Sequence, residues 1–143
     1  MDRISSALLS VFLITSTPST AEYIAPPQDE LINVIEMSKE DYVELTNTFA
    51  VKWGIDETLF NFVIKCESGY NPDAVNWSDS HKLSKGSHGI AQFSKETFMQ
   101  FAKQMGEDYT DPYNAREALD VAGYAIKNGY GNHWTCYRKY LNR

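Results

Sequence analysis

Glu67 is the strongest single candidate for chemistry in the sequence. It follows an apolar run at residues 59–66, and its spacing places it in the last turn of a helix, in register with Phe60 and Ile64. Burial and the negative end of the helix dipole both disfavour a charged carboxylate, so both raise its pKa. A carboxylic acid that keeps its proton near neutral pH can act as a general acid. The alternative interpretation is a solvated glutamate at a helix end.

Two short motifs follow in a fixed order. Residues 67–72 read ESGYNP, and residues 86–93 read GSHGIAQF after a variable loop. With these motifs, the chain from about residue 50 to residue 138 resembles the lytic transglycosylase family (SLT-type domain) of the lysozyme-like superfamily. The family signature is E-S-x-x-N-P, then G-[AS]-x-G-[LI]-x-Q, then an Ala-rich helix. The last part matches only loosely, at Asn114 and Tyr124.

The resemblance implies a mainly α, small lysozyme-like helical domain that acts on peptidoglycan glycan strands without a cofactor. It implies that Glu67 is the catalytic acid/base and that Ser87 and Gln92 line the sugar cleft. It also implies that Tyr124 approaches the glutamate. The bond would be the β-1,4 link between N-acetylmuramic acid and N-acetylglucosamine, cleaved with closure of a 1,6-anhydro ring. The structural alternatives are a surface aromatic at Tyr124 and loop hydrogen bonding to the backbone at Ser87 and Gln92.

Two other functions stay open. Asp73 and Asp79 follow Glu67 in the loop region, and a lysozyme-type hydrolase would use one of them as a second carboxylate. A glycan-binding module that has lost turnover is the other possibility, because a fold alone does not establish an activity. The chemical form of the products separates the two enzymes, and a turnover assay separates both from the binding module.

The elements that must position these residues are five predicted helices. The helix from Glu57 to Ser68 is apolar on nearly every side, so we expect it at the centre of the domain. Residues 69–93 are rich in Gly, Asn, Ser and Asp, which predicts an irregular lobe with short hairpin strands. The predicted helix starts are Ser38 with Asp41, Asp56, Ser94, Asp111-Pro112 and the C-terminal segment from His133.

Glycines and aromatic residues of the lobe fit a sugar groove. Gly86 and Gly89 permit unusual backbone angles and the close approach of a ligand. Trp77, Tyr70 and Phe93 could stack on sugar rings or pack in the core.

Cys66 and Cys136 are the two cysteines of the chain. In an exported protein an even pair predicts a disulfide. The bond would join the helix that carries Glu67 to the C-terminal segment and stabilise the fold by about 4 kcal/mol. Two buried free thiols are the alternative.

Residues 1–21 are predicted to be a signal peptide. Arg3 precedes an apolar stretch at residues 4–15, and small residues follow up to Ala21, near which we expect cleavage. The protein would then be secreted or periplasmic, without stable membrane insertion; an uncleaved anchor is the alternative. Residues 22–37 contain a proline pair and several acids, and we interpret them as a linker or loosely docked arm before a domain at residues 38–143. A short segment whose aliphatic residues at 31–35 pack on the domain is the alternative.

Composition narrows the class of protein further. A chain of 143 residues predicts one domain, and we expect a monomer. A formal charge of −6 gives no basic footprint for nucleic acid. His81, His88 and His133 are scattered without ligand-like spacing, so we predict no metal site.

Overall fold

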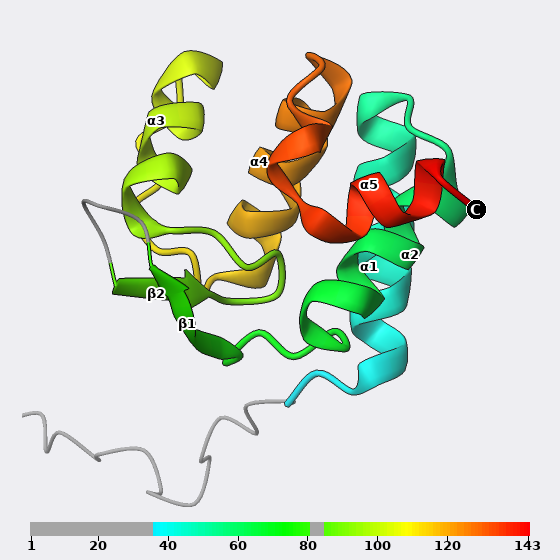
Figure 1. Cartoon of the computed structure of the whole chain (residues 1–143), viewed down its shortest axis with the longest axis horizontal. Helices are drawn as coiled ribbons and strands as arrows, with labels where there is room; N and C mark the ends of the chain where they lie inside the picture. Colours follow the sequence, from blue (N-terminus) through cyan, green and yellow to red (C-terminus); the bar gives the residue numbers. More distant parts are fainter. Residues whose placement is uncertain (1–35, 81–84) are drawn as a thin grey trace, which may run out of the picture. The chain divides into compact units, whose positions relative to one another are not determined.

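The computed structural model describes residues 36–80 and 85–143 (Figure 1), and the predicted signal peptide and most of the predicted arm lie outside them. The described chain is mainly helical with one small antiparallel sheet, as the sequence predicts. None of its helices is long and apolar enough to cross a membrane. Its elements are α1 (Lys39–Trp53), α2 (Glu57–Ser68), β1 (Val75–Ser80), β2 (Lys85–His88), α3 (Lys95–Met105), α4 (Ala115–Lys127), the 3₁₀ turn η1 (Gly131–His133) and α5 (Thr135–Leu141).

Capping residues fix the ends of α1 and α2 where the sequence predicts them. The Ser38 hydroxyl accepts from the Asp41 N–H at 3.2 Å, and the Asp41 carboxylate accepts from the Ser38 N–H at 2.7 Å. Asp56 caps α2 with a single hydrogen bond, accepting from the Leu59 N–H at 2.8 Å. Each helix ends at a glycine with positive φ, which satisfies its last carbonyls. Glu67 therefore lies one turn or less from a well-defined helix end.

The predicted start of α4 at Asp111-Pro112 is wrong. Asn114 is the N-cap, and its side chain accepts from the N–H groups of Arg116 and Glu117. Asp111 instead accepts from the Tyr113 N–H at 3.0 Å and closes a turn before the helix. Aspartate and asparagine both cap helices and turns, so the residue type alone does not say which one starts the helix.

The central helix is α4 rather than α2, contrary to the prediction. It packs against α1, α3 and η1, and it lies between α3 and the α1–α2 pair in Figure 1. Its small residues let its neighbours approach closely: a Cβ at Gly123 would lie 2.2 Å from the Trp53 ring. One face of α2 reaches the surface, where Phe62 contacts the Tyr140 ring and the Arg143 guanidinium. The buried residues of α4 are Ala118, Leu119, Asp120, Val121, Ala122, Gly123, Ala125 and Ile126.

A buried carboxylate joins α1 to α4. Asp120 is 4% exposed and accepts from Lys52 Nζ at 2.6 and 2.8 Å and from the Trp53 indole N–H at 2.8 Å. The Tyr109 hydroxyl donates to it at 3.4 Å. Burial and the neighbouring Asp120 charge raise the pKa of Tyr109. These donors replace the hydrogen bonds to water that the carboxylate loses when it is buried.

We predict that Asp120→Ala destabilises the fold by about 2 kcal/mol, because it leaves the Trp53 N–H without an acceptor. Lys52 is half exposed and can return to water, which keeps the loss below that of a fully buried ion pair. Urea denaturation measures the change. Asp108→Ala, at an exposed acid, is the control and should have little effect. Equal stability of the two variants would contradict this role of Asp120.

The lobe after α2 contains the predicted hairpin. β1 and β2 pair antiparallel, with Val75 opposite His88 and Asn76 opposite Ser87. The register then shifts before Ser80 pairs with Lys85. Such a bulge bends the strand and changes the direction of its side chains.

Candidate active site

Glu67 lies half-buried in the last turn of α2, beside the start of α5. Its Oε1 accepts from the backbone N–H of Cys136 at 3.1 Å. The predicted disulfide is present and joins Cys66 to Cys136, with 5.9 Å between the two Cα atoms. The residue before Glu67 is thus bonded covalently to the residue whose N–H holds the carboxylate. This arrangement fixes the orientation of one carboxylate oxygen.

The surroundings of Glu67 favour its protonated form. Burial is the largest influence, and it raises the pKa of Glu67 above the ordinary value for a glutamate. The negative charge of Asp79 raises it further, whereas the Cys136 N–H and the positive charges of Lys139 and Arg138 lower it. The net direction is upward. Glu67 therefore has the property that a general acid needs.

We predict that activity declines as the pH rises through the raised pKa of Glu67, because the proton needed by the leaving group is then lost. Lys139→Gln removes a charge that lowers this pKa, so the alkaline limb of the pH–rate profile should move to higher pH. Lys127→Gln, at an exposed lysine of α4, is the matched control and should leave the limb unchanged. A limb that moves equally in both variants, or in neither, would contradict this account of the glutamate.

Hydrogen bonds join the two motifs to each other. The Ser68 hydroxyl, next to Glu67, donates to the Ile90 carbonyl at 2.6 Å. The Gly89 N–H donates to the Ala74 carbonyl at 2.8 Å. Gln92 Nε2 donates to the Ala74 carbonyl at 3.1 Å and to the Gly89 carbonyl at 2.9 Å. The end of α2 and the 86–93 segment therefore form one hydrogen-bonded frame.

The Gln92 side chain donates hydrogen bonds to the backbone within this frame. In the sequence-based prediction, such bonds are the alternative to a contact between Gln92 and the sugar. The Gln92 φ of +53° is unusual for a residue with a side chain, and the two side-chain hydrogen bonds hold the strained turn. The need for glycine at position 89 also comes from the chain itself. A Cβ there would lie 2.0 Å from the Pro112 carbonyl oxygen, so this glycine permits a close contact of two backbone segments rather than of backbone and ligand.

Ser87 and Asp79 meet across the hairpin. Ser87 is 3% exposed, and its hydroxyl donates to Asp79 Oδ2. Gln92 borders the same space, so three of the residues singled out in the sequence surround one hollow. The hollow has a volume of about 220 Å³ and is lined by Asp79, Ser87, Gln92, Phe93, Ser94, Thr97, His133 and Trp134.

Other candidates lie elsewhere. Tyr124 packs edge to face on Trp53, with ring centroids 5.5 Å apart, at the interface of α1 and α4. Asp73 lines a separate hollow next to the start of α4. Tyr70 is buried in the core, as the packing alternative for it requires, and Trp77 is 70% exposed. Phe93 is buried as well, but it also lines the hollow beside Ser87. The structure therefore brings Asp79, and not Asp73 or Tyr124, to Ser87 and Gln92.

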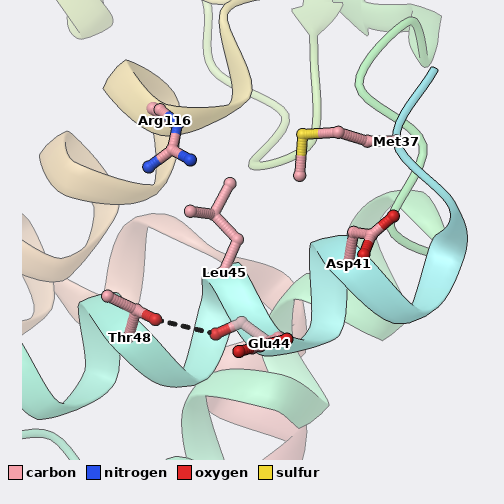
Figure 2. A pocket seen from close by; sticks show the side chains of 6 residues that line it. All are labelled: Met37, Asp41, Glu44, Leu45, Thr48 and Arg116. Atoms are coloured by element: carbon pink, nitrogen blue, oxygen red, sulfur yellow. Dashed lines mark hydrogen bonds between the residues drawn. The ribbon is translucent and has the colours of Figure 1, made fainter. Parts of the chain in front are cut away.

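A larger hollow of about 410 Å³ lies between α1 and the first turn of α4. In Figure 2, Leu45 lies between Met37 and Arg116, and the Thr48 hydroxyl donates to the Glu44 carbonyl at 3.0 Å. None of its lining residues belongs to either motif, and Glu67 is not among them. The smaller hollow beside Ser87 is the candidate site, because Ser87, Gln92 and Phe93 of the second motif line it. Glu67 does not line this hollow either, but the charge of Asp79, which does line it, raises the pKa of Glu67.

Trp134 is a site residue that the sequence did not indicate. It is 5% exposed, its indole N–H donates to the Ala91 carbonyl at 2.7 Å, and its ring meets Phe93 edge to face at 5.2 Å. It thus ties the segment before α5 to the second motif. Its hydrogen-bond partner is a backbone carbonyl far earlier in the chain. The types and spacing of the residues therefore could not predict this contact.

Both ring nitrogens of His88 have hydrogen-bond partners within the protein. His88 lies within hydrogen-bond distance of the Tyr113 hydroxyl and the Lys85 carbonyl, at 2.8 and 3.0 Å. Within residues 36–80 and 85–143, no group of three or more His, Cys, Asp or Glu side chains could hold a metal ion.

Comparison with family models gives one match. The transglycosylase SLT domain matches residues 44–140, which is more than half of the chain. The chain belongs to this family. The matched range begins within α1 and ends within α5, so it contains both motifs, the disulfide and the hollow beside Ser87. Membership in the SLT family supports a transglycosylase-type function related to peptidoglycan. None of the curated proteins compared with the chain matches it.

Proposed function

We propose that the protein is a lytic transglycosylase that cleaves the β-1,4 bond between N-acetylmuramic acid and N-acetylglucosamine, with Glu67 as the general acid and then the general base. The observation that carries the proposal is the environment of Glu67: it is half-buried, its pKa is raised, and the Cys136 N–H orients its carboxylate. A carboxylic acid with a raised pKa and a fixed orientation is what general-acid cleavage of a glycosidic bond requires.

The reaction needs one carboxylate for two proton transfers. Protonated Glu67 gives its proton to the glycosidic oxygen as the bond from that oxygen to C1 of muramic acid breaks. The Glu67 carboxylate then takes the proton of the C6 hydroxyl, and the C6 oxygen bonds to C1. The products are an N-acetylglucosamine end with a free 4-hydroxyl and a 1,6-anhydromuramic acid end. Glu67 is protonated again, and no water is consumed.

A lysozyme-type hydrolase is the second candidate, and one observation favours it. The charge of Asp79 acts on Glu67, so a second carboxylate lies close enough to influence the acid. Hydrolases use such a pair, with the second carboxylate acting as nucleophile or activating a water molecule. The Asp79 carboxylate accepts a hydrogen bond from the Ser87 hydroxyl, which weakens it as a nucleophile or base and favours a supporting role over attack.

Release of soluble fragments from purified peptidoglycan tests whether the protein is an enzyme. We expect release by the wild-type chain and none by Glu67→Gln at the same concentration. A folded wild-type chain that binds peptidoglycan and releases nothing would instead be a glycan-binding module.

We further propose that the protein works outside the cytoplasm, as a secreted or periplasmic monomer, with residues 1–21 removed near Ala21. The Cys66–Cys136 bond supports an oxidising compartment, because cytosolic thiols are kept reduced. Mass spectrometry of the protein recovered from culture medium or periplasm would give the N-terminus. A chain that begins at Met1 would contradict the cleavage.

A further inference from the structure

Transglycosylation by Glu67 alone does not require a hydrogen bond between Asp79 and Ser87. This hydrogen bond is nevertheless present, and it depends on an irregularity of the hairpin. In the regular part of the hairpin Ser87 pairs with Asn76, and Asp79 would not face it. The register shift between Asn76 and Ser80 brings Asp79 to Ser87, so the bulge creates the contact. Bulges often redirect a side chain next to a functional site.

The hydrogen bond to Asp79 determines whether the Ser87 hydroxyl can donate to a ligand or only accept from it. An ionised carboxylate only accepts, so the hydroxyl proton points to Asp79. The Ser87 oxygen keeps its lone pairs for a second partner, and toward that partner it can only accept. Ser87 is 3% exposed and borders the hollow, so the hollow is the place from which a ligand can reach its oxygen.

We propose that Asp79 is a positioning residue of the active site: it holds the Ser87 hydroxyl so that its oxygen accepts a hydrogen bond from an amide N–H or a hydroxyl of the glycan. This role rests on the proposed function, since the glycan is the substrate that the role presupposes. In this role, the Ser87 oxygen selects a sugar group that can donate a hydrogen bond. Asp79 then has a different role from that of the second carboxylate of a hydrolase.

The rest of the hollow suits one substituent of an N-acetylated sugar. Its volume of about 220 Å³ is below the roughly 300–1,000 Å³ of sites that enclose a whole small ligand. Phe93 and Trp134 give it an apolar wall, and their rings are in edge-to-face contact. An acetamido group has an N–H for the Ser87 oxygen and a methyl group for that wall.

The test is a double-mutant cycle on the full chain with Asp79→Ala, Ser87→Ala and both together, measured on peptide-free glycan strands. Because Asp79 acts through Ser87, we expect each single change to raise KM about tenfold, the double change to raise it no further, and kcat to stay within about threefold. Asp79→Asn keeps an acceptor oxygen, so it should retain activity within about threefold of wild type. Melting temperatures of the four proteins serve as the control for folding.

Three results would overturn the role of Asp79. Losses that multiply in the double variant would mean that Asp79 does not act through Ser87. A loss in Asp79→Asn as complete as in Glu67→Gln would make it the second carboxylate of a hydrolase. A loss that follows the melting temperature and disappears on cooling would make it a purely structural residue.

A binding measurement keeps the proposal separate from the enzymatic function. Calorimetry with a short N-acetylglucosamine oligomer needs no turnover, and the same cycle should show the same non-additive, about tenfold loss of affinity. If the wild-type chain releases nothing from peptidoglycan but the binding cycle is non-additive, the proposed reaction fails and the role of Asp79 stands. If the chain is active and the cycle is additive, the reaction stands and the role of Asp79 fails.

Discussion

Glu67→Gln should leave a folded protein that no longer cleaves peptidoglycan. Glutamine has nearly the same shape, and its amide oxygen can still accept from the Cys136 N–H, so the local structure is kept. The amide can neither give a proton to the leaving oxygen nor take one from the C6 hydroxyl. A single general acid or base contributes roughly a hundred- to ten-thousand-fold. Loss of both roles should exceed that range. Fragment release from peptidoglycan measures it.

Glu57→Gln is the matched control, because Glu57 is an exposed glutamate in the first turn of the same helix. It should behave as wild type. If Glu67→Gln, shown to be folded by its circular dichroism and melting, kept more than about a hundredth of wild-type activity, Glu67 would not be the acid and base.

The same substitution has an expected effect on stability. The folded-state pKa of Glu67 is raised by burial, so the folded protein holds this proton more tightly than the unfolded chain does. This contribution is complete below the unfolded pKa and is lost as the pH rises through the raised folded pKa. Glutamine has no charge to bury, so the variant should lose this part of the pH dependence of stability. A wild-type slope in the variant would mean that Glu67 is not desolvated.

Replacing both Cys66 and Cys136 by alanine should have the second largest effect. The disulfide closes a separation of 70 residues, which corresponds to about 4 kcal/mol in the loop-entropy model. Domains of ordinary stability have about 5–15 kcal/mol in total. The melting temperature should therefore fall by about 15 °C. Scanning calorimetry without reductant measures the change.

Activity should fall as well, even well below the new melting temperature. The bond holds the start of α5, whose Cys136 N–H orients Glu67. Small displacements of a catalytic group cost activity, here about tenfold. Reductant should lower the melting temperature of wild type and leave the alanine variant unchanged. If the two proteins had equal melting temperatures before reduction, the disulfide would not stabilise the fold.

Much of the fold follows from local signals in the sequence. Ser38, Asp56 and Ser94 cap helices because their short side chains reach the first free N–H groups, and these caps need no knowledge of the rest of the chain. Glu67 could also be named, since it depends on a residue type at a fixed place along one helix. The disulfide could be named because the chain has two cysteines, which leaves one possible pairing. The choice of Asp79 over Asp73 depends on a bulge, and local spacing does not encode a register shift.

The features that the sequence analysis did not predict depend on contacts between segments that are far apart in the chain. The position of α4 at the centre follows from alanines and Gly123, which matter because three elements crowd around them. Trp134 and the Cys136 N–H act through backbone groups, and every residue carries those, so no pattern of side chains reveals them. Gln92 shows the reverse: its type fits a sugar ligand, but its amide N–H group is bonded to the backbone.

The source of the oxygen in the products tests the central claim most directly. Peptidoglycan is digested in water enriched in heavy oxygen, and the released fragments are analysed by mass spectrometry. With Glu67 as the acid and then the base for the C6 hydroxyl, no water enters the reaction. We therefore expect muramic acid ends that are lighter by one water than hydrolysed ends and carry no heavy oxygen. Reducing muramic acid ends with one heavy oxygen atom each would show that water is the nucleophile and would contradict the account.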